Sequence, residues 1–260
     1  MDPKATTLAL YRTASDRDVT YLAAGFAYYA FVSVIPLVLL ALVVGSLLGG
    51  ERIAQQLILV AGDFLPEAGE DLVTDALTTE AGRTEATVVA LGVAIWGALK
   101  VFRGLSLAFD RIYDEVAEDS LLTEIREGLV VIVAGTGALA LMIVVGTVLG
   151  IVSGAVPYAG VLSWVVLLVG LVLVFLPIYY VLPPISIDLA EAVPGALFAA
   201  VGWAILQAGF QLYAANAGRY QAYGAVGGVL LFVTWLYFAG IVILFGAVLN
   251  VVLSRPALVE

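Results

Sequence analysis

The sequence predicts an all-α membrane protein, and three observations support this fold class. Of the 260 residues, 63% are hydrophobic and only 12% are charged, whereas a soluble domain is about half apolar and about a quarter charged. The segment from Ala23 to Leu48 contains no charged residue and exceeds the roughly 20 residues that a helix needs to cross a bilayer. Apolar runs such as Leu129 to Val133 do not alternate with polar residues, as strands of a membrane barrel would. We therefore expect one integral membrane domain over residues 1–260.

Six transmembrane helices are expected when the chain is divided at its charges, prolines and polar clusters. Their expected ranges are 22–48, 86–108, 128–152, 161–182, 194–215 and 226–253. Pro36 is expected to bend the first helix because it removes a backbone hydrogen bond. Pro183 and Pro184 end the fourth helix. Pro194 and Gly195 open the fifth, since proline is tolerated in a first turn.

The segments between these helices predict short amphipathic interfacial helices. Residues 49–85 form an acidic outer loop, in which apolar residues recur at helical spacing on either side of Pro66. We expect two short helices on the outer surface there. Residues 110–127 mix charges with apolar residues and are expected to form an interfacial helix on the opposite side.

The positions of lysine and arginine predict the orientation of the chain. Eight lie on one side of the expected spans: Lys4, Arg12, Arg17, Lys100, Arg103, Arg111, Arg126 and Arg255. Three lie on the other side: Arg52, Arg83 and Arg219. Because positive loops face the cytoplasm, we expect both termini to be cytoplasmic in the cell (plasma or inner) membrane. Asp2 stands where a signal peptide would be positive, so the first span is expected to be retained.

Composition limits the partners and the chemistry. Acidic residues exceed basic ones by 21 to 11, giving a net charge of −10, and only two basic residues are lysines. This balance predicts a halophilic source, with an acidic outer loop of separate purpose as the alternative, and it argues against a nucleic-acid partner. The chain has no cysteine and no histidine, which leaves carboxylates alone as charged metal ligands. No metal and no cofactor are expected. Without a buried acid pair or a phosphate-binding GxxxxGK[ST] loop, no enzyme activity is expected.

Two polar sets are candidates for binding a substrate or a lipid headgroup. Lys100 and Arg103 lie three residues apart near the cytoplasmic end of the second helix. They either snorkel to the headgroups or bind an anion. The second set is expected to face the bundle interior, where it makes interhelical hydrogen bonds or lines a polar path. Its members are Tyr28, Tyr29, Ser33, Gln207, Gln211 and Asn216.

Glycines four residues apart predict close packing of helices, with a hinge as the alternative. The glycines expected at such packing or hinge positions are Gly146, Gly150, Gly154, Gly224 and Gly228. Pro36 is a further candidate hinge position.

Three stretches of the sequence carry a recognisable set of motifs. The first two are residues 23–36, with their Ala-Tyr-Tyr, serine and proline, and residues 96–113. The third is C-terminal and consists of Pro194-Gly195-Ala196, Trp203, Phe210 to Tyr213, Tyr223 to Gly228, Trp235 to Tyr237, Gly246-Ala247 and Asn250. Together they resemble the YihY/BrkB family of membrane proteins: the first two stretches resemble its first and second helices, and the C-terminal match is the strongest. The sequence departs from the family at Val248, where a glutamate is usual, and at Asp110, where an asparagine is common.

The resemblance implies a six-helix inner-membrane protein, and some family members look like participants in envelope lipid export. We therefore expect a transporter or lipid translocase in envelope biogenesis. A non-transporting scaffold, docking partners on its acidic outer loop, is the alternative. Membrane lipids are the expected partners, and a homo-oligomer or an envelope partner protein is left open. The family's older label, ribonuclease BN, belongs to a zinc-dependent nuclease fold with histidine ligands, and this chain has no histidine.

Overall fold

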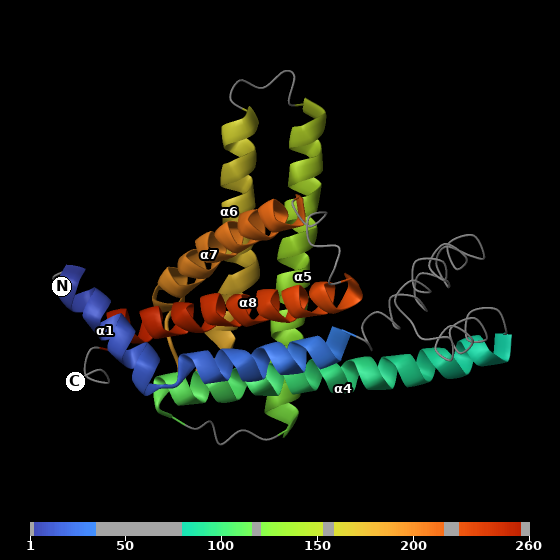
Figure 1. Cartoon of the computed structure of the whole chain (residues 1–260), viewed down its shortest axis with the longest axis horizontal. Coiled ribbons are helices and arrows are strands. Elements are labelled where there is room, and N and C mark those ends of the chain that lie inside the picture. Colours follow the sequence, from blue (N-terminus) through green and yellow to red (C-terminus); the bar gives the residue numbers. More distant parts are fainter. Residues whose placement is uncertain (1–2, 35–79, 116–120, 153–158, 216–223, 256–260) are drawn as a thin grey trace. The chain divides into compact units, whose positions relative to one another are not determined.

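The computed structural model describes residues 3–34, 80–115, 121–152, 159–215 and 224–255 (Figure 1). The helices in these ranges are α1 (Pro3–Asp16), a helix over Val19–Val34, α4 (Glu80–Tyr113), α5 (Leu121–Val152), α6 (Ala159–Val181), α7 (Leu189–Ala215) and α8 (Gly224–Ser254). The described ranges contain no strand. The all-α prediction is confirmed for this part of the chain.

Helices lie in each of the six ranges expected to span the membrane, although the first is described only as far as Val34. Four of them are long and apolar enough to cross a bilayer, namely those containing Ile125–Thr147, Val161–Val181, Leu189–Tyr213 and Gly227–Ser254. These helices agree with a polytopic membrane protein.

The chain divides into two compact parts, which are described separately. The smaller part comprises residues 29–101. In it the Ser33 hydroxyl oxygen lies 3.0 Å from the Gly97 carbonyl oxygen and 2.8 Å from that of Tyr29. Ser33 therefore shares its proton between its own helix and α4.

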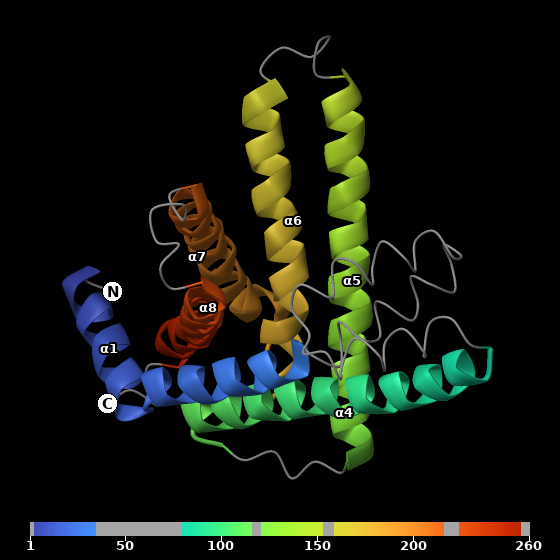
Figure 2. The same cartoon turned by 45° about the vertical axis from the view of Figure 1, so that its right-hand side comes forward.

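The larger part comprises residues 1–28 and 102–260. In it α5 packs against α6, α6 against α7, and α8 against both α7 and α1 (Figure 2). The buried fraction of the apolar stretch falls from 61% in α8 to 28% in α7, 17% in α6 and 6% in α5. The core is therefore built around α8, whereas α5 leaves nearly all of its apolar surface uncovered by the described chain.

Aromatic side chains join α6, α7 and α8. The Trp203 ring meets Phe175 edge-on at 5.5 Å and Trp235 at 5.1 Å between ring centroids. Phe210 meets Trp235 at 6.2 Å. Such tilted pairs are the favoured geometry for aromatic contacts. The tryptophans that carry the family resemblance thus have a packing role.

The boundaries of α6 and α7 differ in how well the sequence predicted them. As expected, α6 ends at Val181, just before the two prolines. The expectation that Pro194 opens the next helix is wrong, because α7 already begins at Leu189. The carbonyl of Asp188 accepts hydrogen bonds from the amides of Glu191 and Ala192, which starts the helix ahead of the proline.

The interfacial helix expected over residues 110–127 is absent from the described part of that range. Instead, α4 continues to Tyr113 and α5 begins at Leu121. Ile112 and Tyr113 are buried in the core, so tertiary packing extends α4. The helix α1 was not predicted. Residues 49–79, where two surface helices were expected, lie outside the described residues.

Candidate functional site

The exposed face of α4 carries a line of large basic and apolar side chains. Trp96, Lys100, Arg103, Leu107 and Arg111 are all exposed, and they recur every three or four residues, which places them on one face of the helix. The Lys100 ammonium lies 5.2 Å from the centroid of the Trp96 ring, within range of a cation–π contact. We call this line the α4 stripe.

The opposite face of α4 explains why the stripe points outward from Arg103 onward. Leu105, Ala108, Phe109 and Ile112 are buried in the core, and the Phe109 ring packs 5.9 Å from that of Tyr179. When one face of a helix is buried against the core, the opposite face is directed away from the core. Lys100 and Arg103 form no ion pair among the described residues, so both cations are open to an external anion.

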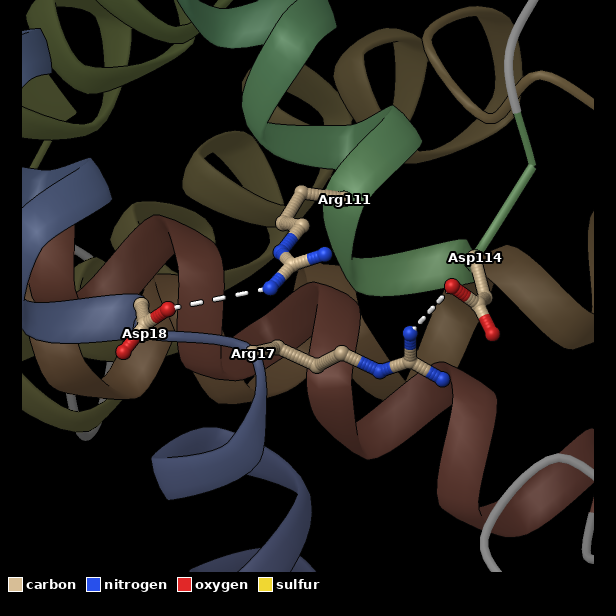
Figure 3. Close-up of polar contacts among 4 residues, drawn as sticks. All are labelled: Arg17, Asp18, Arg111 and Asp114. Atoms are coloured by element: carbon tan, nitrogen blue, oxygen red, sulfur yellow. Dashed lines mark ion pairs between the residues drawn. The ribbon is translucent and has the colours of Figure 1, made fainter.

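Two ion pairs tie the end of α4 to the end of α1 (Figure 3). Arg17 contacts the Asp114 carboxylate at 2.5 Å, and Arg111 lies 3.8 Å from that of Asp18. The hydrogen bond and the charge of Arg17 lower the pKa of Asp114 below its usual value. Each pair has an exposed member, so solvent screens both.

The aspartates of these pairs also shape the chain. Asp18 (φ 55°) and Asp114 (φ 58°) adopt the left-handed conformation, which aspartate tolerates better than most residues. Asp18 turns the chain from α1 into the next helix, and its carbonyl accepts bonds from the Tyr21 and Leu22 amides. Asp114 ends α4, where the Glu115 amide bonds back to the Asp110 carbonyl.

A buried polar contact fixes α7 to α8. The Asn250 side-chain oxygen accepts a 2.6 Å hydrogen bond from the Gly195 amide, and its nitrogen lies 3.4 Å from the Ala192 carbonyl. Pro194 has no N–H to give to the helix ladder, so the backbone there is already interrupted. Asn250 thus supplies hydrogen-bond partners to the Gly195 amide and the Ala192 carbonyl on either side of Pro194.

Close backbone approach accompanies this contact. A Cβ added at Gly195 would lie 2.6 Å from the Gly246 carbonyl oxygen, and one at Gly246 would collide with the Tyr179 ring. The Tyr179 hydroxyl donates a 2.7 Å bond to the Ile243 carbonyl. Glycine is needed at both positions because any side chain would force the helices apart.

Three further polar atoms are buried near Asn250, at the ends of α4, α7 and α8. The Tyr113 hydroxyl, Glu191 Oε2 and Arg255 Nε have no hydrogen-bond partner among the described residues. Burial raises the pKa of Tyr113 to about 12, with Arg255 and Asn250 opposing the rise and Glu191 adding to it. These groups give the end of the bundle a polar interior.

The structure separates the members of the second predicted set. Ser33 is buried and bonded between two helices. Tyr28 and Tyr29 are 63% and 38% exposed, and Gln207 and Gln211 are also exposed. The sequence predicted that these four side chains face the bundle interior. In the described part of the chain they are exposed instead. Asn216 lies outside the described residues.

The predicted glycine positions stand in open space where they are described. A Cβ added at Gly146, Gly150 or Gly228 would meet no atom within 4 Å, so no helix of the described chain packs closely there. Gly224 is the first residue of α8. Pro36 and Gly154 lie outside the described residues.

Sequence reasoning missed several residues that the structure brings together. Glu191 falls between the expected spans 161–182 and 194–215, yet it lies in the first turn of α7 and inside an apolar stretch long enough to span. Tyr113 and Tyr179 gave no signal, since single tyrosines are common in apolar helices. Asn250 did give one, because an amide in an apolar helix needs a partner. Val248, which departs from the family resemblance, is completely buried in the core.

The described residues contain no group of three or more histidine, cysteine, aspartate or glutamate side chains placed to hold a metal ion.

Comparison with known proteins agrees with the family resemblance. The family described as Virulence factor BrkB matches residues 10–260. A UPF0761 membrane protein of Pseudoalteromonas translucida is 25% identical over 253 residues, which cover 92% of this chain and 82% of the relative. A UPF0761 membrane protein of Azoarcus is 27% identical over 258 residues, covering 92% of this chain and 60% of the relative.

A shorter match carries a different label. The ribonuclease-like protein YfkH of Bacillus subtilis is 34% identical over 95 residues, which cover 36% of this chain and 34% of the relative. The chain therefore spans less than two thirds of YfkH and of the Azoarcus protein. No solved structure matches the chain.

Proposed function

Since the chain belongs to the BrkB family of membrane proteins, we propose that it is a transporter or lipid translocase that acts on anionic lipids in envelope biogenesis. The observation that carries this proposal is the pair of exposed cations on α4, Lys100 and Arg103, which form no ion pair among the described residues. The proposal assigns the protein no catalytic role and no nucleic-acid partner.

The proposed topology has six spans, with both termini on the cytoplasmic side of the cell membrane. The four long apolar helices supply four spans, and the ranges 22–48 and 86–108 supply the other two. The C-terminal ends of α4 and α8 then lie on the same side as the N-terminal end of α7. That side carries eight of the eleven basic residues, as the positive-inside rule requires.

The surroundings of Lys100 and Arg103 favour a headgroup as the anion. Ile95, Trp96 and Leu107 are each more than half exposed, so the cations stand within an apolar face of the helix. Lysine and arginine in such a place extend toward the bilayer surface. Anionic headgroups there are attracted by about 1 kcal/mol for each basic residue near the surface. The cations would thus collect anionic lipids from the cytoplasmic leaflet.

Reconstitution into proteoliposomes tests this proposal. Movement of fluorescently labelled phosphatidylglycerol between leaflets should be faster than in empty vesicles and several-fold slower in the double variant Lys100→Ala/Arg103→Ala. The matched control is Lys100→Arg/Arg103→Lys, which keeps both charges and should retain activity. Equal rates for the wild type, the alanine variant and empty vesicles would contradict the proposal.

A scaffold without transport is the second candidate, and the bare apolar surface of α5 favours it. Only 6% of its apolar stretch is buried by the described chain, which leaves room for a partner helix as well as for lipid. Crosslinking in native membranes from labelled positions on α5 should then recover one consistent envelope protein. Recovery of lipid alone, together with measurable lipid movement, would exclude this alternative.

A further inference from the structure

The outward face of α1 is amphipathic in a way that the proposed transport role does not use. Leu8 is 50% exposed and Tyr11 is 71% exposed, and Arg12 and Ser15 are exposed beside them. Spacings of three and four residues place all four on one face.

The opposite face of α1 is fixed to the bundle. Thr13 and Ala14 are buried, and Ala9 and Leu10 pack against the core. The helix contacts α8, beside its C-terminal end in both views (Figures 1 and 2). Packing against the core therefore explains the apolar residues on the inward face only. It does not explain why Leu8 and Tyr11 are on the outward face.

The depth of α1 follows from what it contacts. The apolar stretch Gly227–Ser254 of α8 is long enough to span, so its end lies near the boundary between hydrocarbon and headgroups. Arg17 and Arg111 tie the end of α1 to the end of α4 through the ion pairs shown in Figure 3. Attachment at two helix ends holds α1 at the level of the membrane surface.

We propose that α1 lies in the bilayer interface and binds an anionic lipid surface, with Leu8 and Tyr11 inserted among the lipids and Arg12 against the headgroups. Apolar residues on one side of a helix and basic residues around them are the pattern of interfacial helices. Tyrosine is enriched at this level because its ring is apolar and its hydroxyl is wet. Arg12 forms no ion pair among the described residues, so its charge is available to a phosphate. This inference requires membrane residence but no transport activity.

Site-directed spin labelling tests the proposal directly, because the chain has no cysteine to remove. Leu8→Cys and Tyr11→Cys would each carry a nitroxide in nanodiscs that contain phosphatidylglycerol. Glu115→Cys, exposed beyond the end of α4, supplies the aqueous reference. The labels at positions 8 and 11 should be several-fold less accessible to a water-soluble nickel relaxant than the reference and several-fold more accessible to oxygen.

The charge contribution is tested with Arg12→Glu and with nanodiscs of phosphatidylcholine alone. Either change should raise the nickel accessibility at position 11 several-fold. Aqueous readings at both labelled positions would overturn the proposal, and so would labels that neither relaxant reaches, because these indicate a protein contact. Equal readings in the two lipid compositions would overturn the assignment of an anionic surface. Having two labelled positions keeps the test decisive if one variant does not fold.

Discussion

The α7–α8 pair and the α5–α6 pair are both made of apolar helices, yet they meet their surroundings differently. The apolar stretch of α8 is 61% buried, and that of α5 is 6% buried. Asn250, Gly195 and Gly246 bring polar and small groups into the first pair. On α5 the exposed side chains are mainly leucine, isoleucine and valine. The contrast teaches that hydrophobicity places a helix in the membrane, whereas small and polar residues decide which helices pack together.

The largest expected effect separates a glycine at the α7–α8 contact from one on α5. Gly195→Ala should destabilise the protein by about 3 kcal/mol, because the new methyl group would overlap the Gly246 carbonyl and the Asn250 side chain. Gly146→Ala should be neutral or stabilising by up to about 1 kcal/mol, since its Cβ meets no atom. Thermal unfolding in detergent, followed by size-exclusion chromatography, measures both. Similar losses of stability in the two variants would contradict the difference in packing between the α7–α8 contact and α5.

The second-largest loss of stability is expected when the buried side-chain amide of Asn250 is replaced. Asn250→Leu should cost about 2 kcal/mol, because the Gly195 amide is left without its acceptor. The matched control is Thr234→Val on the same helix, where the hydroxyl bonds only to the Leu230 carbonyl of its own helix and is exposed. It should change stability by less than about 0.5 kcal/mol. The same unfolding assay applies, and an equal effect of the two substitutions would refute a special role for Asn250.

Neighbouring tyrosines on α6 give a closer test. Tyr179→Phe should cost about 1 kcal/mol, since the Tyr179 hydroxyl bonds to the Ile243 carbonyl in the core. Tyr180→Phe should have almost no effect because that residue is 50% exposed. If Tyr180→Phe proved the more damaging in thermal unfolding, α6 would face the other helices through a different side.

The smallest effect concerns the exposed ion pair at the end of α4. The pKa of Asp114 is lower in the folded protein than in the unfolded chain. Its contribution to stability is therefore complete above the unfolded pKa of about 3.9 and is lost as the pH falls through the folded pKa. Unfolding measured from neutral pH to about pH 3 should show the wild type converging on Asp114→Asn. Asp16→Asn is the control, and a wild-type advantage that persists at low pH would contradict the assignment.

Much of the fold was predictable because it depends on local physics. The apolar runs predicted helices in all six ranges, and Pro183 marked the end of α6. The extension of α4 to Tyr113 was not predictable, since burial against other helices decides it. The start of α7 at Leu189 was missed for a similar reason, because the Asp188 carbonyl starts the helix ahead of Pro194 and Asn250, from α8, bonds to the Gly195 amide beside it.

The candidate site was predicted in part. Lys100 and Arg103 stand exposed on one face of α4, a relation that helical spacing alone implies. Gln207 and Gln211 were expected to face the interior, but they lie on the exposed face of α7. Their spacing placed them together, yet spacing does not say which way a face turns. The partners of Asn250 lie 55 and 58 residues away in the chain, and one sequence contains no record of such a contact.

By itself the sequence determined that this protein is helical and resides in a membrane, because hydropathy and helical period are properties of neighbouring residues. Tertiary structure alone decided that Gly195, Gly246 and Asn250 form one contact, whereas Gly146 and Gly228 stand in open space. Glycines in either setting look alike along the chain. Only the distance between backbones distinguishes them, and that distance is set by how whole helices pack.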